Sequence, residues 1–435
     1  MKKIAKRVLL ITMCCILLIP CLAGCSQKGK TLMKLDGEKM SVNTYMLFLS
    51  RVKGTLASSA NFGASALKDS FWDTVMSSDG VTTYNDYYSQ MVLDSAKKYL
   101  AASYLFDEEG LKLDDDVKAE VKDAMDKLVA SDGEGSKTAL NAKLAEFGAN
   151  YAVLKDAYEI EAKIAALNEH LYGENGSKIS SNVIEDYYQK TYVKFKHVFL
   201  YTYAIVYETD DNGDEIYYTS DGRIAYDTSR KQKTDANGDP VKDSNGDIIY
   251  VKRDGSGIAY DTEKGERKAA IDEDGYTMTR DYTTEELRKV SDMAQIIMES
   301  AVEGDEKIFD SLVEEYNEDE GMNEYTGGYY MTRDTAYDSP EVLEALFEME
   351  EGEIRKIRSD YGIHVVMKYE LDKGGYAKES NSVFFVDSDG NYLFMDDLKT
   401  QLLDARLASY IAQIEIKEEL IEGVDMKSVG ANYNY

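Results

Sequence analysis

The sequence predicts an α+β protein: a helical domain formed from N- and C-terminal segments, and an α/β domain with an antiparallel sheet that carries a β-hairpin-rich insertion. Three observations predict this class. Apolar residues recur at a three-four spacing over long segments near both ends of the chain, as in amphipathic helices. Short strand-like runs rich in Val, Ile and Phe stand in the middle. Asn-Gly and Asp-Gly pairs, which permit the positive φ angles of tight hairpins, crowd residues 208–282.

The first segment has the features of a targeting signal. Four basic residues precede an apolar run of about 15 residues and a small-residue site: Lys2, Lys3, Lys6, Arg7 and then Leu22-Ala23-Gly24-Cys25. A membrane-spanning helix needs about 20 apolar residues, so we expect residues 1–24 to be a removable signal peptide. The last four residues resemble a bacterial lipobox, which implies acylation of Cys25, a tether over residues 25–30 and a place on the extracytoplasmic face of the cell membrane. An ordinary secretory signal is the alternative.

Cysteine content and charge exclude several classes of protein. All four cysteines lie within residues 14–25, so no later thiol is available for disulfides, thiolate metal sites or nucleophilic catalysis. Of the 50 basic residues, the signal segment holds four and no acidic partner, which leaves 46 basic against 81 acidic residues and a net charge of −35. Such a chain does not bind nucleic acid by neutralising phosphates. No cofactor or metal is expected.

Residues 31–190 are expected to form the larger part of the helical domain. Residues 31–39 predict a strand with a turn at Asp36-Gly37, and a helix is expected to begin near Ser41. His170 is interpreted as a surface or cap residue. Two segments each carry one apolar stripe at helical spacing: Tyr88, Val92, Ala96, Tyr99, Ala102 and Phe106, and then Val153, Ala157, Ile160, Ile164, Leu167 and Leu171.

The C-terminal segment, residues 371–435, predicts one long helix. Its stripe contains no proline or glycine before Gly423, which is the expected C-cap. A lone helix cannot bury such a face by itself, so we expect it to pack back onto residues 31–190 and to complete the helical domain. The stripe consists of Leu403, Leu407, Tyr410, Ile414 and Ile421.

The insertion, residues 208–282, contains an internal duplication. Asp211-Asn-Gly-Asp-Glu-Ile-Tyr-Tyr is echoed 33 residues later by Ser244-Asn-Gly-Asp-Ile-Ile-Tyr-Val, and Ile224-Ala-Tyr-Asp-Thr recurs 34 residues later at Ile258. The turn pairs and the flanking Ile and Tyr residues predict β-hairpin repeats. Calcium loops are the alternative because Asp-x-Asn-Gly-Asp superficially resembles an oxygen-rich loop, although neither copy has the later glutamate of an EF-hand.

With the insertion set aside, residues 193–207 and 283–369 predict the order strand, helix, helix, strand, helix, strand, strand. Five blocks resemble the parvulin family of peptidyl-prolyl cis-trans isomerases (PPIases), in the family's order. This resemblance implies a parvulin-like PPIase domain over residues 191–370. The blocks are Lys194-Phe-Lys-His-Val-Phe-Leu, Phe309-Asp-Ser-Leu-Val-Glu-Glu-Tyr-Asn-Glu-Asp, Gly327-Gly328, Leu343-Glu-Ala-Leu-Phe-Glu-Met-Glu-Glu-Gly-Glu-Ile and Asp360-Tyr-Gly-Ile-His-Val-Val-Met-Lys.

The resemblance also implies the site residues. The family's catalytic positions are occupied by His197, Asp319, His364 and Ser359, and its substrate-binding region by Val342, Tyr330, Phe347 and Met349. The chain departs from the family after the glycine pair, where residues 329–331 replace Asp-Leu-Gly, and at residue 342, where the family has phenylalanine. A pocket without its aromatic wall grips proline weakly. Two alternatives therefore stay open, an isomerase of weak activity and a domain that has lost it.

The lipobox, the flanking helices and the parvulin blocks together resemble the extracytoplasmic foldase lipoproteins of the PrsA/SurA type. This resemblance implies a SurA-N-like helical chaperone domain over residues 31–190 and a membrane-anchored foldase that assists the folding of secreted proteins. Its partners are then unfolded or nascent secreted polypeptides and the cytoplasmic membrane, and a homodimer stays open. Two other functions also stay open: a holdase chaperone with an inactive parvulin domain, and a surface adhesion or binding lipoprotein.

Overall fold

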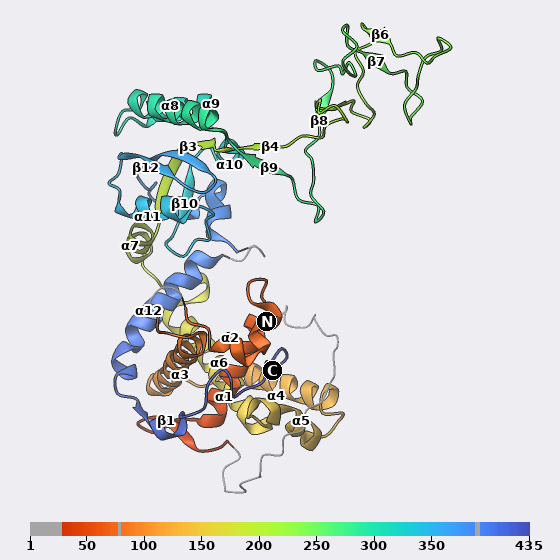
Figure 1. The fold of residues 1–435 in the computed structure, drawn as a ribbon. Coiled ribbons are helices and arrows are strands. Elements are labelled where there is room, and N and C mark those ends of the chain that lie inside the picture. The colour runs from red at the N-terminus through yellow and green to blue at the C-terminus, as the bar shows by residue number, and fades with distance from the viewer. Residues whose placement is uncertain (1–27, 77–79, 388–391) are drawn as a thin grey trace. The chain divides into compact units, whose positions relative to one another are not determined.

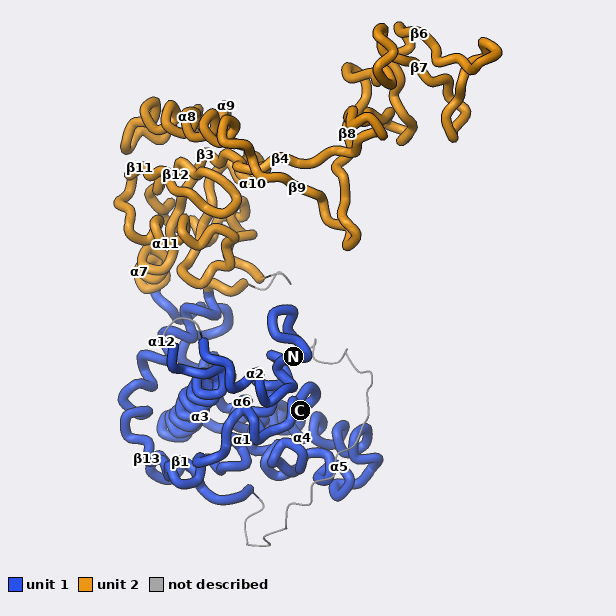
Figure 2. The backbone as a smooth tube through the Cα atoms, viewed as in Figure 1, with its two compact units in different colours: residues 1–180, 395–435 blue, residues 181–394 orange. Residues whose placement is uncertain are grey.

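The computed structural model describes residues 28–76, 80–387 and 392–435 (Figure 1). The predicted signal peptide and the lipidation of Cys25 lie outside the described residues. The chain divides into two compact units: unit 1 comprises residues 1–180 and 395–435, and unit 2 comprises residues 181–394 (Figure 2). In the described part of the chain, no helix combines the length and the apolar character needed to cross a membrane.

Unit 1 consists of helices around one core, with a small sheet. Side-chain oxygens begin its long helices, since the Ser41 hydroxyl accepts from the amide of Thr44, and Thr83 forms a capping box with Asp86. Both predicted apolar stripes contribute buried residues to this core. The elements are β1 (Thr31–Leu35), β2 (Glu38–Ser41), α1 (Val42–Ser58), α2 (Asp69–Trp72), α3 (Tyr84–Glu108), α4 (Asp115–Ser131), α5 (Lys137–Leu144), α6 (Tyr151–Tyr172), most of α12 (Leu393–Ile411) and β13 (Glu415–Ile416).

The C-terminal segment departs from the predicted single helix. α12 ends at Ile411, and β13 then pairs with the edge of β1 that β2 leaves free. An unpaired strand edge offers backbone donors and acceptors, so a short strand there is favoured over further helical turns. The prediction of a helix reaching a C-cap at Gly423 is therefore wrong. Leu403 and Leu407 of the predicted stripe nevertheless lie in the same core as α1, α3 and α6.

Unit 2 contains a four-stranded antiparallel sheet in the order β10-β3-β12-β11. One face joins Val198 and Val365 in a core with α8 and α9, and the other joins Phe195 and Val366 in a core with α11. Apart from the short helix α10, the elements follow the predicted order, and the α+β fold class is confirmed. They are α7 (Ser181–Thr191), β3 (Val193–Tyr201), α8 (Thr284–Ser300), α9 (Glu306–Tyr316), α10 (Glu320–Glu324), β10 (Tyr329–Met331), α11 (Pro340–Glu348), β11 (Ile354–Arg358) and β12 (Gly362–Tyr369).

The insertion consists of short paired strands and turns, as predicted. Within unit 2, the chain leaves the four-stranded sheet and returns to it through an antiparallel ribbon of β4 and β9, so the two ends of the insertion are adjacent in space. Longer strands do not form, because a turn follows every few residues (Figure 1). Its strands are β4 (Tyr203–Ile205), β5 (Tyr217–Tyr218), β6 (Lys231–Gln232), β7 (Tyr250–Val251), β8 (Glu266–Arg267) and β9 (Thr279–Asp281).

The two copies of the duplicated sequence bind each other reciprocally. The Tyr226 hydroxyl of the first copy donates to Asp243 at the turn of the second, and the Tyr260 hydroxyl of the second copy donates to Asp210 at the turn of the first, each over 3.1 Å. The main chains also exchange hydrogen bonds between residues 225–227 and 259–261. The duplication therefore builds one unit from two equivalent halves.

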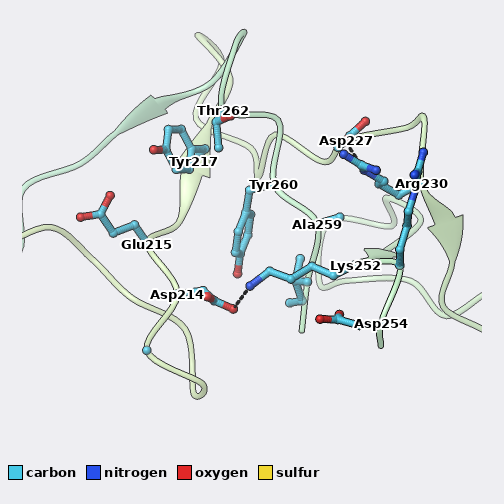
Figure 3. Close-up of a pocket in the computed structure, with 13 residues that line it drawn as sticks. Asp214, Glu215, Tyr217, Asp227, Arg230, Lys252, Asp254, Ala259, Tyr260 and Thr262 are labelled. Atoms are coloured by element: carbon cyan, nitrogen blue, oxygen red, sulfur yellow. Dashed lines mark hydrogen bonds and ion pairs between the residues drawn. The ribbon is translucent and has the colours of Figure 1, made fainter. Parts of the chain in front are cut away.

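A cavity of about 560 Å³ opens between these halves (Figure 3). Two ion pairs line it, because Lys252 donates to Asp214 over 2.7 Å and Arg230 donates to Asp227 over 2.8 Å. The turn aspartates are also engaged, since Oδ1 of Asp243 accepts two backbone amides. Among the described residues, no group of three or more His, Cys, Asp or Glu side chains is placed to hold a metal ion.

Candidate active site

The strand pairing of β3 with β12 brings two histidines together. Val366 lies opposite His197, and His364 lies opposite Phe199, so the two imidazoles project from the same face of the sheet at diagonal positions. Their Nδ1 atoms are 3.2 Å apart, and their ring centroids are 5.2 Å apart. The histidines are 167 positions apart in the chain, and the insertion accounts for much of that separation.

Asp319 joins the pair from the loop that follows α9. Its Oδ1 accepts from the amide of Gly321 over 2.9 Å and caps α10, and its Oδ2 lies 2.9 Å from Nε2 of His197. Asn317 fixes this loop against β3, because its side chain accepts from the amide of Phe199 and donates to the carbonyl of Asp319. The carboxylate is therefore held at the histidines by both its own bonds and those of its loop.

Two serines complete the network on the side of His364. The Ser359 hydroxyl lies 2.9 Å from Nε2 of His364, and the Ser339 hydroxyl lies 3.4 Å from the same atom. Ser359 also accepts from the amides of Tyr361 and Gly362, which leaves its own proton free to be donated to the imidazole. Both hydroxyl groups belong to buried residues.

The hydrogen bonds of these groups have one consistent order. An ionised carboxylate only accepts, so His197 donates from Nε2 to Asp319. When His197 is neutral, its Nδ1 accepts, and His364 donates from its own Nδ1. Nε2 of His364 then accepts from the Ser359 hydroxyl. The protons thus all point from Ser359 toward Asp319.

Burial and charge determine the protonation of this network. Both imidazoles are only 2% exposed. Burial, together with the neighbouring His197, lowers the pKa of His364 to about 3, so this ring is neutral at physiological pH. Burial alone would raise the pKa of Asp319, but hydrogen bonds from His197 and Tyr329 outweigh it and lower that pKa below its ordinary value. The site therefore presents the carboxylate of Asp319 and a neutral imidazole at His364.

The titration of His364 can be observed directly, because the chain contains only three histidines. In imidazole proton NMR spectra, we expect the signal that is absent from a His364→Gln variant to stay in its neutral position until the pH falls to about 3. Since the ordinary histidine pKa is about 6.5, the unfolded chain gains a proton that the folded chain does not, and stability falls as the pH drops from about 6.5 toward 3. A His364 signal that titrates between pH 6 and 7 would contradict the buried network.

The structure places the four residues predicted for substrate binding outside the hydrogen-bond network of the histidines. Val342 and Met349 are buried in the core between α11 and the sheet. Phe347 lies at the edge of that core, with the guanidinium of Arg333 4.3 Å from its ring centroid. The hydroxyl of Tyr330 donates to Asp372 over 2.9 Å, and this side chain lies on the opposite face of β10 from its neighbour Tyr329.

Sequence reasoning did not assign Tyr329 or Ser339 to the site. Tyr329 lies opposite Phe195 on the face of the histidines, and its hydroxyl donates to Oδ2 of Asp319 over 2.7 Å. The glycine pair before β10 indicates that a strand begins there. It does not show which side chains of the strand face the histidines, because a shift of one residue moves every side chain to the other face of the sheet. Ser339 precedes α11 and stands at its N-cap position, where its hydroxyl turns to His364.

Comparisons with known proteins agree with the parvulin resemblance. Residues 269–370 match the family model of the PPIC-type PPIase domain, which confirms the resemblance for this segment. The matched range begins after most of the insertion and omits β3, so His197 joins the domain only through the strand pairing described above. No curated protein matches the chain.

Solved structures of PrsA proteins also align with the chain over most of its length, at low identity. PrsA from Bacillus subtilis is 14% identical, with 81% of this chain and 92% of that chain covered and a TM-score of 0.19. The peptidylprolyl isomerase PrsA from Bacillus cereus is 13% identical, with 80% and 90% covered and a TM-score of 0.26. The foldase protein PrsA from Streptococcus pneumoniae is 12% identical, with 81% and 97% covered and a TM-score of 0.20.

Proposed function

We propose that this chain, whose residues 269–370 form a parvulin-type PPIase domain, is a membrane-anchored extracytoplasmic foldase that isomerises prolyl bonds in secreted polypeptides. The observation that carries the proposal is the continuous hydrogen-bond network from Ser359 through His364 and His197 to Asp319 on the sheet of that domain. The lipobox ending in Cys25 supports the anchor, and the net negative charge keeps the chain soluble and disfavours nucleic acid as a partner.

The chemistry of the reaction suits a site without a strong nucleophile. Rotation about a prolyl peptide bond has a barrier of about 20 kcal/mol, and the twisted amide loses its resonance and its charge separation. Surroundings that exclude water from the amide therefore favour the twisted form over the planar one. A carboxylate near the carbonyl oxygen opposes the polar resonance form in the same direction.

Asp319 has the properties that this role needs. Its side chain is 26% exposed, so the carboxylate borders solvent, whereas the imidazole of His197 behind it is 2% exposed. Aromatic rings of Phe195 and Phe199 lie beside the histidines, at ring centroid distances of 5.8 Å from His197 and 4.7 Å from His364. A substrate amide at Asp319 would thus meet an anion that is backed by apolar rings and by the neutral imidazole of His364. His197 and His364 hold that anion in place.

The proposal is tested by the isomerisation rate of a prolyl test peptide with and without the protein. We expect the wild-type chain to accelerate the reaction, and Asp319→Ala and His364→Ala to lower kcat/KM about tenfold or more, as for the loss of a positioned catalytic group. His170→Ala, an exposed histidine in α6, is the matched control and should leave kcat/KM unchanged. Equal rates with and without wild-type protein would refute the enzymatic proposal.

One observation favours a second candidate, a holdase chaperone with a catalytically silent parvulin domain. The hydroxyl of Tyr329 already donates a hydrogen bond to the carboxylate of Asp319, and both imidazoles are buried. In that case the full chain would suppress the aggregation of an unfolded secreted protein equally well with and without His364→Ala, and would not accelerate isomerisation. The same set of variants therefore separates the two candidates.

A further inference from the structure

Tyr329 is the one tyrosine of β10 that faces the histidines, and the surrounding chain is shaped to admit its hydroxyl. The hydroxyl donates to Oδ2 of Asp319 over 2.7 Å, the same oxygen that Nε2 of His197 approaches to 2.9 Å. A side chain at Gly321 would collide with the Tyr329 hydroxyl, so the glycine leaves the space that the phenol fills. The contact therefore depends on two positions, Gly321 in α10 and Tyr329 on β10.

The ring of Tyr329 is held on several sides. It packs against Phe195 at a centroid distance of 5.6 Å, against Phe384 at 5.9 Å and against Tyr325 at 6.0 Å. Its edge also meets the imidazole of His197 at 6.0 Å. A ring fixed by these neighbours presents its hydroxyl to Asp319 at little entropic cost.

From this geometry we propose that Tyr329 is a positioning residue for the isomerase reaction: its phenol fixes the carboxylate of Asp319 toward His197 and thereby sets the direction of the hydrogen bonds through both imidazoles. The inference rests on the proposed function, in which Asp319 acts on the prolyl amide. It adds Tyr329 as a residue that acts on the reaction through Asp319.

The physical reason lies in how the proton order depends on Asp319. While Asp319 is a carboxylate, His197 donates from Nε2, and the chain of donors runs from Ser359 to Asp319. If Asp319 takes up a proton while both rings are neutral, it can donate to Nε2 of His197, so His197 then carries its proton on Nδ1 and His364 carries its own on Nε2. Both tautomers then switch together, because each ring nitrogen is bonded to the next group.

Tyr329 opposes that switch by donating to the ionised form. A hydrogen bond to the charged state favours the charged state. The other titratable groups around Asp319 come from several elements. These groups are His197 and Tyr201 on β3, Tyr337 before α11, and Glu318 and Glu320 on either side of Asp319.

The test compares Tyr329→Phe with Tyr330→Phe, two adjacent substitutions on β10. Each removes one hydroxyl that donates to a carboxylate, but Tyr330 donates to Asp372 on the other face of the strand. In nitrogen-15 NMR spectra of the imidazoles, we expect Tyr329→Phe to raise the pH midpoint of the tautomer switch by about one pH unit, the effect of losing one charge-assisted hydrogen bond. Tyr330→Phe should leave the midpoint where it is in the wild type.

The isomerase assay gives the second readout. The acidic limb of the kcat/KM profile should move upward with the tautomer midpoint in Tyr329→Phe and should stay in place in Tyr330→Phe. An unchanged midpoint in Tyr329→Phe, an equal shift in both variants, or a faster reaction in Tyr329→Phe would overturn the inference. A wild-type chain without isomerase activity would refute the proposed function, while the imidazole spectra would still decide whether Tyr329 sets the proton order.

Discussion

Gly54→Ala is expected to lower the free energy of unfolding of unit 1 by about 3 kcal/mol, although alanine favours a helix over glycine by about 1 kcal/mol. Gly54 lies in α1, where a Cβ would collide with the main chain of Asn432. The C-terminal residues would have to leave α1, and with them Met426 and Val429, which are 0% and 4% exposed in the core. Helix propensity alone predicts that Gly54→Ala stabilises the protein, so a loss of stability would report the contact with the main chain of Asn432.

The cost includes a buried lysine beside Gly54. The ammonium of Lys53 donates to the carbonyls of Met426 and Val429 over 2.8 and 2.9 Å, and the residue is 5% exposed. Once the C-terminal residues leave, these acceptors are lost, and a buried charged donor without acceptors is destabilising. Urea unfolding can be followed by the fluorescence of Trp72, the single tryptophan, which is fully buried in the same core.

Two controls separate the contact from helix propensity. Thr55→Ala, at an exposed position of the same helix, should leave stability unchanged or slightly higher. In a chain shortened after residue 425, Gly54→Ala should become neutral or stabilising, because its collision partner is gone, and the double-mutant cycle then gives the coupling directly. Equal stability of Gly54→Ala and the wild type in the full chain would show that the C-terminal residues do not lie against α1.

The elements that depend on local pattern could be predicted from the sequence, and those that depend on distant partners could not. The stripes that contain Val92 and Val153 predict α3 and α6, because helical spacing is a local property. The stripe beyond Leu407 continues at helical spacing as well, yet the chain leaves the helix at Ile411. The deciding interaction there is the pairing of β13 with β1, which lies almost the whole chain away.

The site shows the same division. The parvulin resemblance names His197, Asp319, Ser359 and His364, and the structure places all four in one network. The resemblance does not reveal which tyrosine of β10 faces this network. Adjacent residues of a strand face opposite sides of the sheet, and a shift of one residue exchanges the two sides. The resemblance implied Tyr330 as a substrate-binding residue, whereas the pairing with β3 places Tyr329 against Asp319.

Gly328→Ala is expected to have the second large effect, and it tests whether the pairing of β10 with β3 places Tyr329 on the face of the histidines. Gly328 has a φ of +95°, and a Cβ there would lie 2.7 Å from the carbonyl oxygen of Phe195 on β3. Alanine would therefore add backbone strain and push β10 away from β3, at a cost of about 3 kcal/mol to the stability of the sheet. Hydrogen exchange of β3 and β12, measured by mass spectrometry, should become faster by more than a hundredfold, since about 1.4 kcal/mol corresponds to tenfold.

The adjacent Gly327 is the matched control. It has no left-handed φ, and nothing lies within 4 Å of the position that its Cβ would take. Gly327→Ala should therefore leave hydrogen exchange and isomerase activity as they are in the wild type. Gly328→Ala should also lower kcat/KM at least tenfold, because a displaced β10 withdraws the Tyr329 hydroxyl from Asp319. If the two alanine variants exchange equally slowly, the close approach of β10 to β3 is not what places Tyr329 in the site.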